Sequence, residues 1–189
     1  MAQSDWDFEN SNWTIDSGQY VSSPSSLKNT GNCNILSRRS NCQNLPQGRV
    51  IFWWRATGTA LWLSIHMRNQ AALGTADRQN CYTLVRTLSG SQAQVNRYEA
   101  GTSVWYQSFG TPAALLADTW YKFRVTWWNN WGKIRFRLER WNGSAWVQEG
   151  SDIEDSTNKW NTSSVNRVGL QLINLTEYHD DTELWGVLT

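Results

Sequence analysis

The fold of this chain is decided by residues 120–141, which read WYKFRVTWWNNWGKIRFRLERW. Large apolar side chains occupy every second position on either side of an Asn-rich turn: Tyr121, Phe123, Val125 and Trp127 before it, and Ile134, Phe136 and Leu138 after it. A period of two is typical of a strand that buries one face, and Asn142-Gly143 is a further tight-turn signal before residues 145–147. The segment therefore predicts a meander of three antiparallel strands.

Short runs rich in Val, Ile, Thr, Phe and Trp recur along the rest of the chain between clusters of Asn, Ser and Gly. Strands are expected at residues 49–56, 60–68, 82–87, 93–98, 102–108, 168–172 and 183–187. The first two runs are more continuously apolar, which predicts central strands covered on both sides. Residues 112–118 are expected to form a helical turn, and residues 157–164 a polar loop. Since helical periodicity is otherwise almost absent, residues 1–189 are predicted to form one all-β domain, an antiparallel two-sheet β-sandwich.

Charge and composition narrow the function classes. Seventeen basic and sixteen acidic residues leave a formal net charge of +1, which argues against nucleic-acid binding as the main activity. No stretch approaches the roughly 18 apolar residues of a membrane-spanning helix, so membrane insertion is not expected. The N-terminus carries neither the basic nor the apolar part of a secretory signal. We expect an extracellular protein whose leader was removed, or a virion or cell-surface protein released by another route.

Three cysteines leave the redox state open. Cys33 and Cys42 flank a short loop in which a disulfide bridge is geometrically possible, and three unpaired thiols are the alternative. No pair of cysteines has zinc-ligand spacing, and two histidines leave little material for a His-based metal site.

Four motifs, in order along the chain, resemble those of the concanavalin A-like lectin/glucanase superfamily, in its laminin-G-like branch. Residues 120–127 are similar to its "W-y-x-f-x-v" strand, residues 132–138 to its "G-x-i-x-x-x-l" strand and residues 168–170 to its "v-G-l" strand. Residues 178–181 are similar to the closing "y-F-D-D" strand, with His179 where that family usually has an aromatic residue. The resemblance implies a concanavalin A-like jelly-roll sandwich, and it does not imply one function.

A structural calcium ion is the first site that the resemblance implies. Residues 6–9 are similar to the first strand of many carbohydrate-binding modules of this architecture. In such sandwiches the first and last strands commonly lie side by side, often with a calcium ion near them. Asp7, Glu9, Asp180 and Asp181 would then supply the hard oxygen ligands that calcium takes. The alternative is that these acids cap turns and face solvent.

A carbohydrate platform is the second candidate site. Fourteen tryptophans exceed what one small core can fully bury, and sugars present apolar C–H faces to flat aromatic rings. The outer face of residues 120–141 and the strand at 49–56 combine such rings with hydrogen-bonding groups. The candidate ligand-binding residues are Trp54, Arg55, Arg124, Trp128, Arg135, Arg137 and Trp141.

The remaining tryptophans divide by strand phase. Trp127 is in phase with Phe123 and is assigned to the core, whereas Trp6, Trp120 and Trp185 are assigned to the frame of the sandwich. The alternative for any tryptophan is packing between the sheets or under loops, with arginines stacked on the exposed ring faces.

Catalysis is not expected. The Glu-x-Asp-x-x-Glu strand of the superfamily's glucanases is absent. Residues 64–66 (Ser-Ile-His) only weakly resemble the Gln-x-His strand of the related alginate lyases. We therefore predict a non-catalytic module that binds a glycan, a polysaccharide or another surface polymer. The alternative is a virion decoration, structural or adhesion protein that uses the same sandwich to self-associate or to coat a protein lattice. A glycan-active hydrolase or lyase is the third hypothesis.

Overall fold

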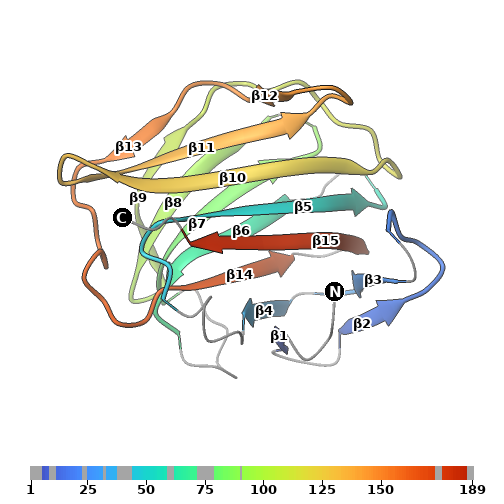
Figure 1. Cartoon of the computed structure of the whole chain (residues 1–189), viewed down its shortest axis with the longest axis horizontal. Coiled ribbons are helices and arrows are strands. Elements are labelled where there is room, and N and C mark those ends of the chain that lie inside the picture. The colour runs from blue at the N-terminus through green and yellow to red at the C-terminus, as the bar shows by residue number, and fades with distance from the viewer. Residues whose placement is uncertain are drawn as a thin grey trace.

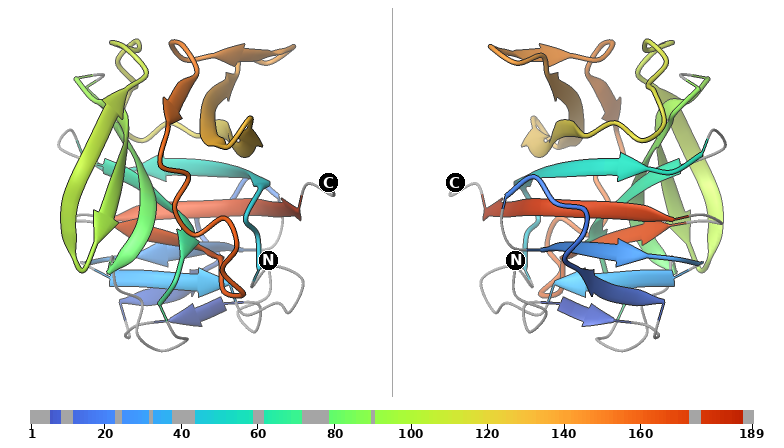
Figure 2. Two further views of the ribbon diagram at one scale, coloured as in Figure 1. Left: turned by 90° about the vertical axis from the view of Figure 1, so that its left-hand side faces the viewer. Right: turned by 90° about the vertical axis from the view of Figure 1, so that its right-hand side faces the viewer.

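The protein is an all-β sandwich. The computed structural model describes residues 6–8, 12–22, 25–31, 33–37, 44–58, 62–71, 79–89, 91–172 and 176–186. Within these ranges it contains fifteen strands and no helix, so no helix there is long and apolar enough to cross a membrane. The strands form two antiparallel sheets packed face to face (Figure 1, Figure 2), which confirms the predicted fold class.

Sheet A has seven strands, in the spatial order β1-β4-β14-β6-β7-β8-β9. Their bounds are β1 (Trp6–Phe8), β4 (Cys33–Ser37), β14 (Arg167–Leu172), β6 (Trp62–Asn69), β7 (Asn80–Thr87), β8 (Ala93–Glu99) and β9 (Thr102–Ser108). The strands β6 to β9 are consecutive in the chain and in the sheet, and each pairs antiparallel with the next.

Sheet B has eight strands, in the order β12-β11-β10-β5-β15-β3-β2, with β13 also paired to β11. Their bounds are β12 (Trp146–Gln148), β11 (Lys133–Trp141), β10 (Tyr121–Asn130), β5 (Gly48–Ala56), β15 (Glu177–Gly186), β3 (Ser26–Asn29), β2 (Trp13–Asp16) and β13 (Ile153–Asp155). The neighbours β10, β11 and β12 form the predicted meander, and Figure 1 shows β11, β10, β5 and β15 side by side.

The hydrophobic core lies between the two sheets. Trp127 is fully buried together with Phe123 and Val125, which confirms the inward phase expected for β10. Its indole N–H donates to the carbonyl of Leu45 at 3.1 Å, so the polar atom of this large side chain is satisfied inside the core. Full burial of a large apolar side chain contributes about 1.5 to 3 kcal/mol, and the inward positions of β10 and β11 supply much of the core.

Two details differ from the sequence expectations. Residues 112–118 form no helical turn, because their amides bond to other segments: Leu115 N donates to Leu88 O at 2.7 Å, and Asp118 N to Ala56 O at 2.8 Å. The strand β5 is fully covered on its inner face only, since its outward side chains are half-buried or exposed. The strand β6 is buried on both faces, as predicted.

Candidate functional site

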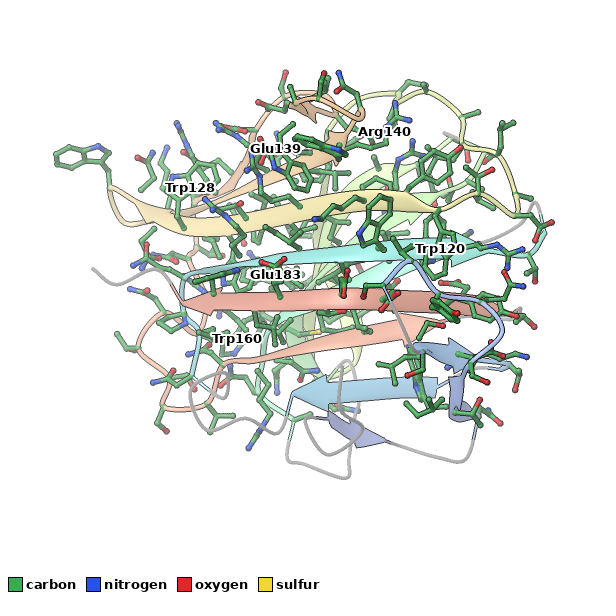
Figure 3. The ribbon with its side chains drawn as sticks, turned by 45° about the vertical axis from the view of Figure 1, so that its right-hand side comes forward. Trp120, Trp128, Glu139, Arg140, Trp160 and Glu183 are labelled. Carbon is green, nitrogen blue, oxygen red and sulfur yellow. The ribbon has the colours of Figure 1, made fainter. Side chains whose placement is uncertain are left out.

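The outer face of sheet B carries the side chains that alternate with the core positions. On β10 these include Lys122 and Trp128, on β11 Glu139 and Trp141, and on β5 Trp53. Figure 3 shows Trp128 and Glu139 along this face, with Trp120 toward the other end of β10. The face is rich in aromatic and charged groups.

A pocket of about 460 Å³ lies at one end of this face, and we call it the tryptophan pocket. The register of the paired strands explains where this pocket lies. Tyr121 of β10 is opposite Trp54 of β5, and Phe123 of β10 is opposite Arg140 of β11. This pairing brings together the end of β5, the start of β10 and the end of β11. The lining residues are Trp53, Trp120, Tyr121, Lys122, Arg140, Trp141, Asn142 and Gly143.

Contacts among aromatic rings and cations hold the walls of the tryptophan pocket. The Trp141 ring packs edge-on against Trp146, with centroids 5.5 Å apart, and Trp120 lies 6.3 Å from the Tyr178 ring. The ammonium group of Lys122 lies 5.7 Å from the centroid of the Trp53 ring. Because neighbouring rings and charges fix their orientation, the tryptophans form a prearranged apolar surface.

The turn at residues 142–145 supplies the polar edge of the pocket. The side-chain carbonyl of Asn142 accepts hydrogen bonds from Ser144 N and Ala145 N, both at 2.9 Å. Gly143 has a φ of 103°, a conformation that only glycine adopts without strain. The Asn142 carbonyl is thus used within the turn, and its amide N–H groups remain as donors at the pocket edge.

The predicted arginines of β10 and β11 form ion pairs along the rest of the face. Arg124 Nε donates to Glu139 at 2.6 Å, and its guanidinium stacks 4.5 Å from the centroid of Trp146. Further along, Arg137 bonds Asp152 at 2.8 and 2.6 Å and stacks on Trp128. The hydrogen bonds that Arg137 donates to Asp152 raise the pKa of the Arg137 guanidinium.

The strand β13 also neutralises the cations at the far end of β11. Glu154 accepts from Arg135 Nε at 2.7 Å and from Lys133 Nζ at 2.6 Å, and these bonds lower its pKa to about 2. On β5, Arg55 pairs with Asp118 at 2.9 Å and lies over the Tyr178 ring. Of the seven predicted ligand-binding residues only Trp141 lines the tryptophan pocket. A role in binding for Trp128 and the four predicted arginines stays a prediction.

The prediction that Trp54 faces a ligand is wrong. Its side chain is fully buried, and its indole N–H donates to the buried carboxyl group of Glu177 at 2.5 Å. The period of two along β5 places Trp54 in phase with Val50 and Phe52, so the outward tryptophan of this pair is Trp53. Trp120, which we assigned to the frame, lines the pocket instead, and Trp185 is 57% exposed.

Asp7 and the pair Asp180 and Asp181, three of the four acids of the predicted calcium site, lie in different sheets. The strand β1, with Asp7, lies at the edge of sheet A, whereas β15, with Asp180 and Asp181, lies within sheet B, so the premise of adjacent first and last strands is wrong. Asp180 accepts from the amides of Val21, Ser22 and Asp181 at 2.7 to 2.9 Å, which occupies both of its oxygens. Within the described ranges no group of three or more His, Cys, Asp or Glu residues could hold a metal ion.

Two predictions fall on residues that the structure does not describe. Glu9 and Cys42 lie outside the described ranges, so the part of Glu9 in a metal site and the Cys33–Cys42 bridge stay predictions. Cys81 is buried in β7.

The outward side of sheet A carries a smaller polar cluster. His66 on β6 is buried, and its Nε2 lies 3.2 Å from Gln171 Oε1 on β14. Its Nδ1 lies 3.6 Å from Cys81 Sγ on β7. These contacts tie three neighbouring strands together.

Comparisons with known proteins bear on the fold. The sequence matches no protein-family model and no curated protein. Among solved structures, the carbohydrate binding module CBM66 from Bacillus subtilis superposes with a TM-score of 0.56 at 10% identity, over 96% of each chain. The exoplasmic/lumenal domain of VIP36, in its Ca2+/Man3GlcNAc-bound form, gives 0.55 at 10% identity, over 98% of this chain and 85% of that one.

A third similar structure is part of a longer enzyme. Xylan beta-1,4-xylosidase from Bacillus halodurans C-125 gives a TM-score of 0.54 at 10% identity, over 98% of this chain and 40% of that chain. Identities this low show a common fold and leave function to be argued from the site. The chain therefore shares the two-sheet β-sandwich fold of these carbohydrate-binding and lectin-like structures, which is the fold that its sequence motifs implied.

Proposed function

We propose that the chain is a non-catalytic module that binds carbohydrate in the tryptophan pocket. The observation that carries the proposal is the convergence of Trp53, Trp120 and Trp141, from three separate segments, on one hollow of about 460 Å³. A cavity of this size suits a small ligand or one end of a polymer. Flat apolar rings suit the C–H faces of a sugar, and the donors of Asn142 and Arg140 suit its hydroxyl groups.

The similar structures support the same proposal. One is named as a carbohydrate binding module, and another was solved with a mannose-containing glycan. Both share this fold over most of the present chain. The extracellular or surface location, self-association and the decoration or adhesion role remain predictions.

Loss of a pocket tryptophan should weaken sugar binding. We expect Trp53→Ala and Trp141→Ala each to raise the Kd for a bound oligosaccharide about tenfold or more, because truncation of a central aromatic residue at an interface costs about 2 kcal/mol. Isothermal titration against cello-, xylo- and manno-oligosaccharides measures the change. A reducing-end assay on the same mixtures should detect no turnover.

Trp131→Ala is the matched control. Trp131 is 96% exposed in the turn between β10 and β11 and does not line the pocket, so its loss should leave the Kd unchanged. Equal losses in all three variants would place binding elsewhere. Unaltered binding in both pocket variants would overturn the proposal.

A further inference from the structure

The charged side chains that line the tryptophan pocket are all positive. Its lining includes two cations, Lys122 and Arg140, and no acidic residue. The charge of Arg140 is partly compensated, since its Nε lies 3.0 Å from Glu149 Oε1 and its guanidinium stacks on Tyr121. Lys122 therefore presents the less compensated charge in the pocket.

Lys122 differs from most cations on the outer face of sheet B. Arg124, Arg135 and Arg137 each have a carboxylate within hydrogen-bond distance. Within the described residues, no carboxylate lies within 4.0 Å of the Lys122 ammonium group, whose recorded contact is the face of Trp53 at 5.7 Å. This half-buried charge stands in the pocket without a counter-charge from the described chain.

Three carboxylates on sheet B, those of Glu139, Glu149 and Asp180, already accept hydrogen bonds from other donors. Glu139 is bound by Arg124, and Glu149 by Arg86. Asp180, which lies opposite Trp53 in the β5–β15 pair, accepts three backbone amides. None of these acids is free to turn toward Lys122 without leaving a donor unpaired, and a buried unpaired donor is costly.

We infer that the tryptophan pocket selects an anionic sugar residue, carboxylated or sulfated, whose charged group pairs with Lys122. Aromatic walls lower the local dielectric and strengthen the attraction between an ammonium group and an anion. Hydrogen bonds between charged partners are about twice as strong as neutral ones. This inference rests on the proposed function and names the class of ligand for the same pocket.

The test compares anionic with neutral saccharides. Oligogalacturonate carries carboxylates, chondroitin sulfate oligosaccharides carry sulfates as well, and cello-oligosaccharides are neutral. We expect at least one anionic probe to bind about tenfold more tightly than the neutral probe at low salt. The preference should shrink at high salt, because ions screen exposed charges. The two anionic probes show which group is preferred.

Lys122→Gln should reduce the ratio of anionic to neutral affinity about tenfold. Lys159→Gln is the matched control, since Lys159 is exposed beside Glu99 and does not line the pocket, and its ratio should stay unchanged. Thermal melting of both variants should match the parent, because neither side chain is buried.

The outcomes separate the two proposals. If neutral probes bind, Trp53→Ala weakens that binding as expected and no anionic preference exists, the inference fails and the proposed function stands. If Lys122→Gln leaves an anionic preference intact, the preference arises elsewhere and the inference also fails. If no saccharide of either kind binds, the proposed function itself fails.

Discussion

Replacement of Glu149 by glutamine should lower the free energy of unfolding by about 3 to 5 kcal/mol, the usual cost of leaving one buried ionic partner alone. Glu149 follows β12 in sheet B, and its Oε2 accepts from Nε of Arg86 at 2.8 Å. Arg86 is fully buried on β7 of sheet A, so this pair joins the two sheets inside the sandwich. The amide keeps the shape of the side chain but leaves the Arg86 charge without its counter-charge.

Urea unfolding followed by tryptophan fluorescence measures this loss, and Asp152→Asn is the matched control. Asp152 pairs with Arg137 at the surface, where the side chains are 23% and 40% exposed. Loss of such an exposed pair should cost about 0 to 1 kcal/mol, because water and salt already screen it. Equal losses in the two variants would contradict the prediction.

A double-mutant cycle with Arg86→Met gives a second readout. The guanidinium of Arg86 also donates to the carbonyl oxygens of Thr87 and Ala113, so Arg86→Met alone should be destabilising. The double variant should nevertheless lose less than the sum of the single losses, because it contains no unpaired buried cation. Simple additivity would show that the two side chains do not act as a pair.

The fold was predictable from the sequence because strand alternation is local. On β10, Phe123, Val125 and Trp127 point inward and Lys122 and Arg124 outward, as their spacing predicted. The same rule applied strictly to β5 would have chosen Trp53 over Trp54. Trp54 was expected to face outward beside Arg55, but alternation from Val50 and Phe52 places it in the core.

The site was less predictable because it depends on partners distant in the sequence. Asp152, which precedes β13, and Glu154, which lies in β13, form ion pairs with Arg137 and Arg135. These pairs leave the two arginines less available to a ligand than the sequence suggested. The tryptophan pocket needs the register of three strands, which alternation alone does not supply. The calcium prediction assumed that the first and last strands are neighbours, whereas the structure places β1 and β15 in different sheets.

The substitution His179→Phe should raise the free energy of unfolding by about 2 kcal/mol at pH 7. His179 is fully buried, and its ring centroid lies 5.9 Å from those of both Trp13 and Phe52. Within the described residues neither of its ring nitrogens has a hydrogen-bond partner, and Nε2 lies 3.7 Å from Glu177 Oε2. A phenyl ring keeps the aromatic contacts and removes both unsatisfied polar atoms.

Lowering the pH should increase the difference in free energy of unfolding between the parent protein and the His179→Phe variant. Burial lowers the pKa of His179 to about 3, whereas an imidazole in an unfolded chain titrates near about 6.5. Between these two pH values the His179 imidazole binds a proton in the unfolded state and stays neutral in the folded state. The parent therefore loses up to about 1.4 kcal/mol per pH unit as the pH falls through this window, and the phenylalanine variant does not.

The buried carboxyl group of Glu177 changes the stability with pH in the direction opposite to His179. Burial raises its pKa well above the ordinary value, so its contribution to stability is present at low pH and is lost as the pH rises through that raised pKa. This contribution is common to both proteins and cancels in their difference. The pH dependence of the difference therefore reports on His179.

Urea midpoints of both proteins at pH 7, 6 and 5 test the prediction, with an expected difference of about 4 kcal/mol at pH 5. His66→Phe is the control, because His66 is equally buried but lies within hydrogen-bond distance of Gln171, so its replacement should destabilise the protein. A difference that stays constant with pH would mean that folded His179 binds its proton normally, by pairing with Glu177. In that case the two residues would form an ion pair inside the core, and replacement of either would be destabilising.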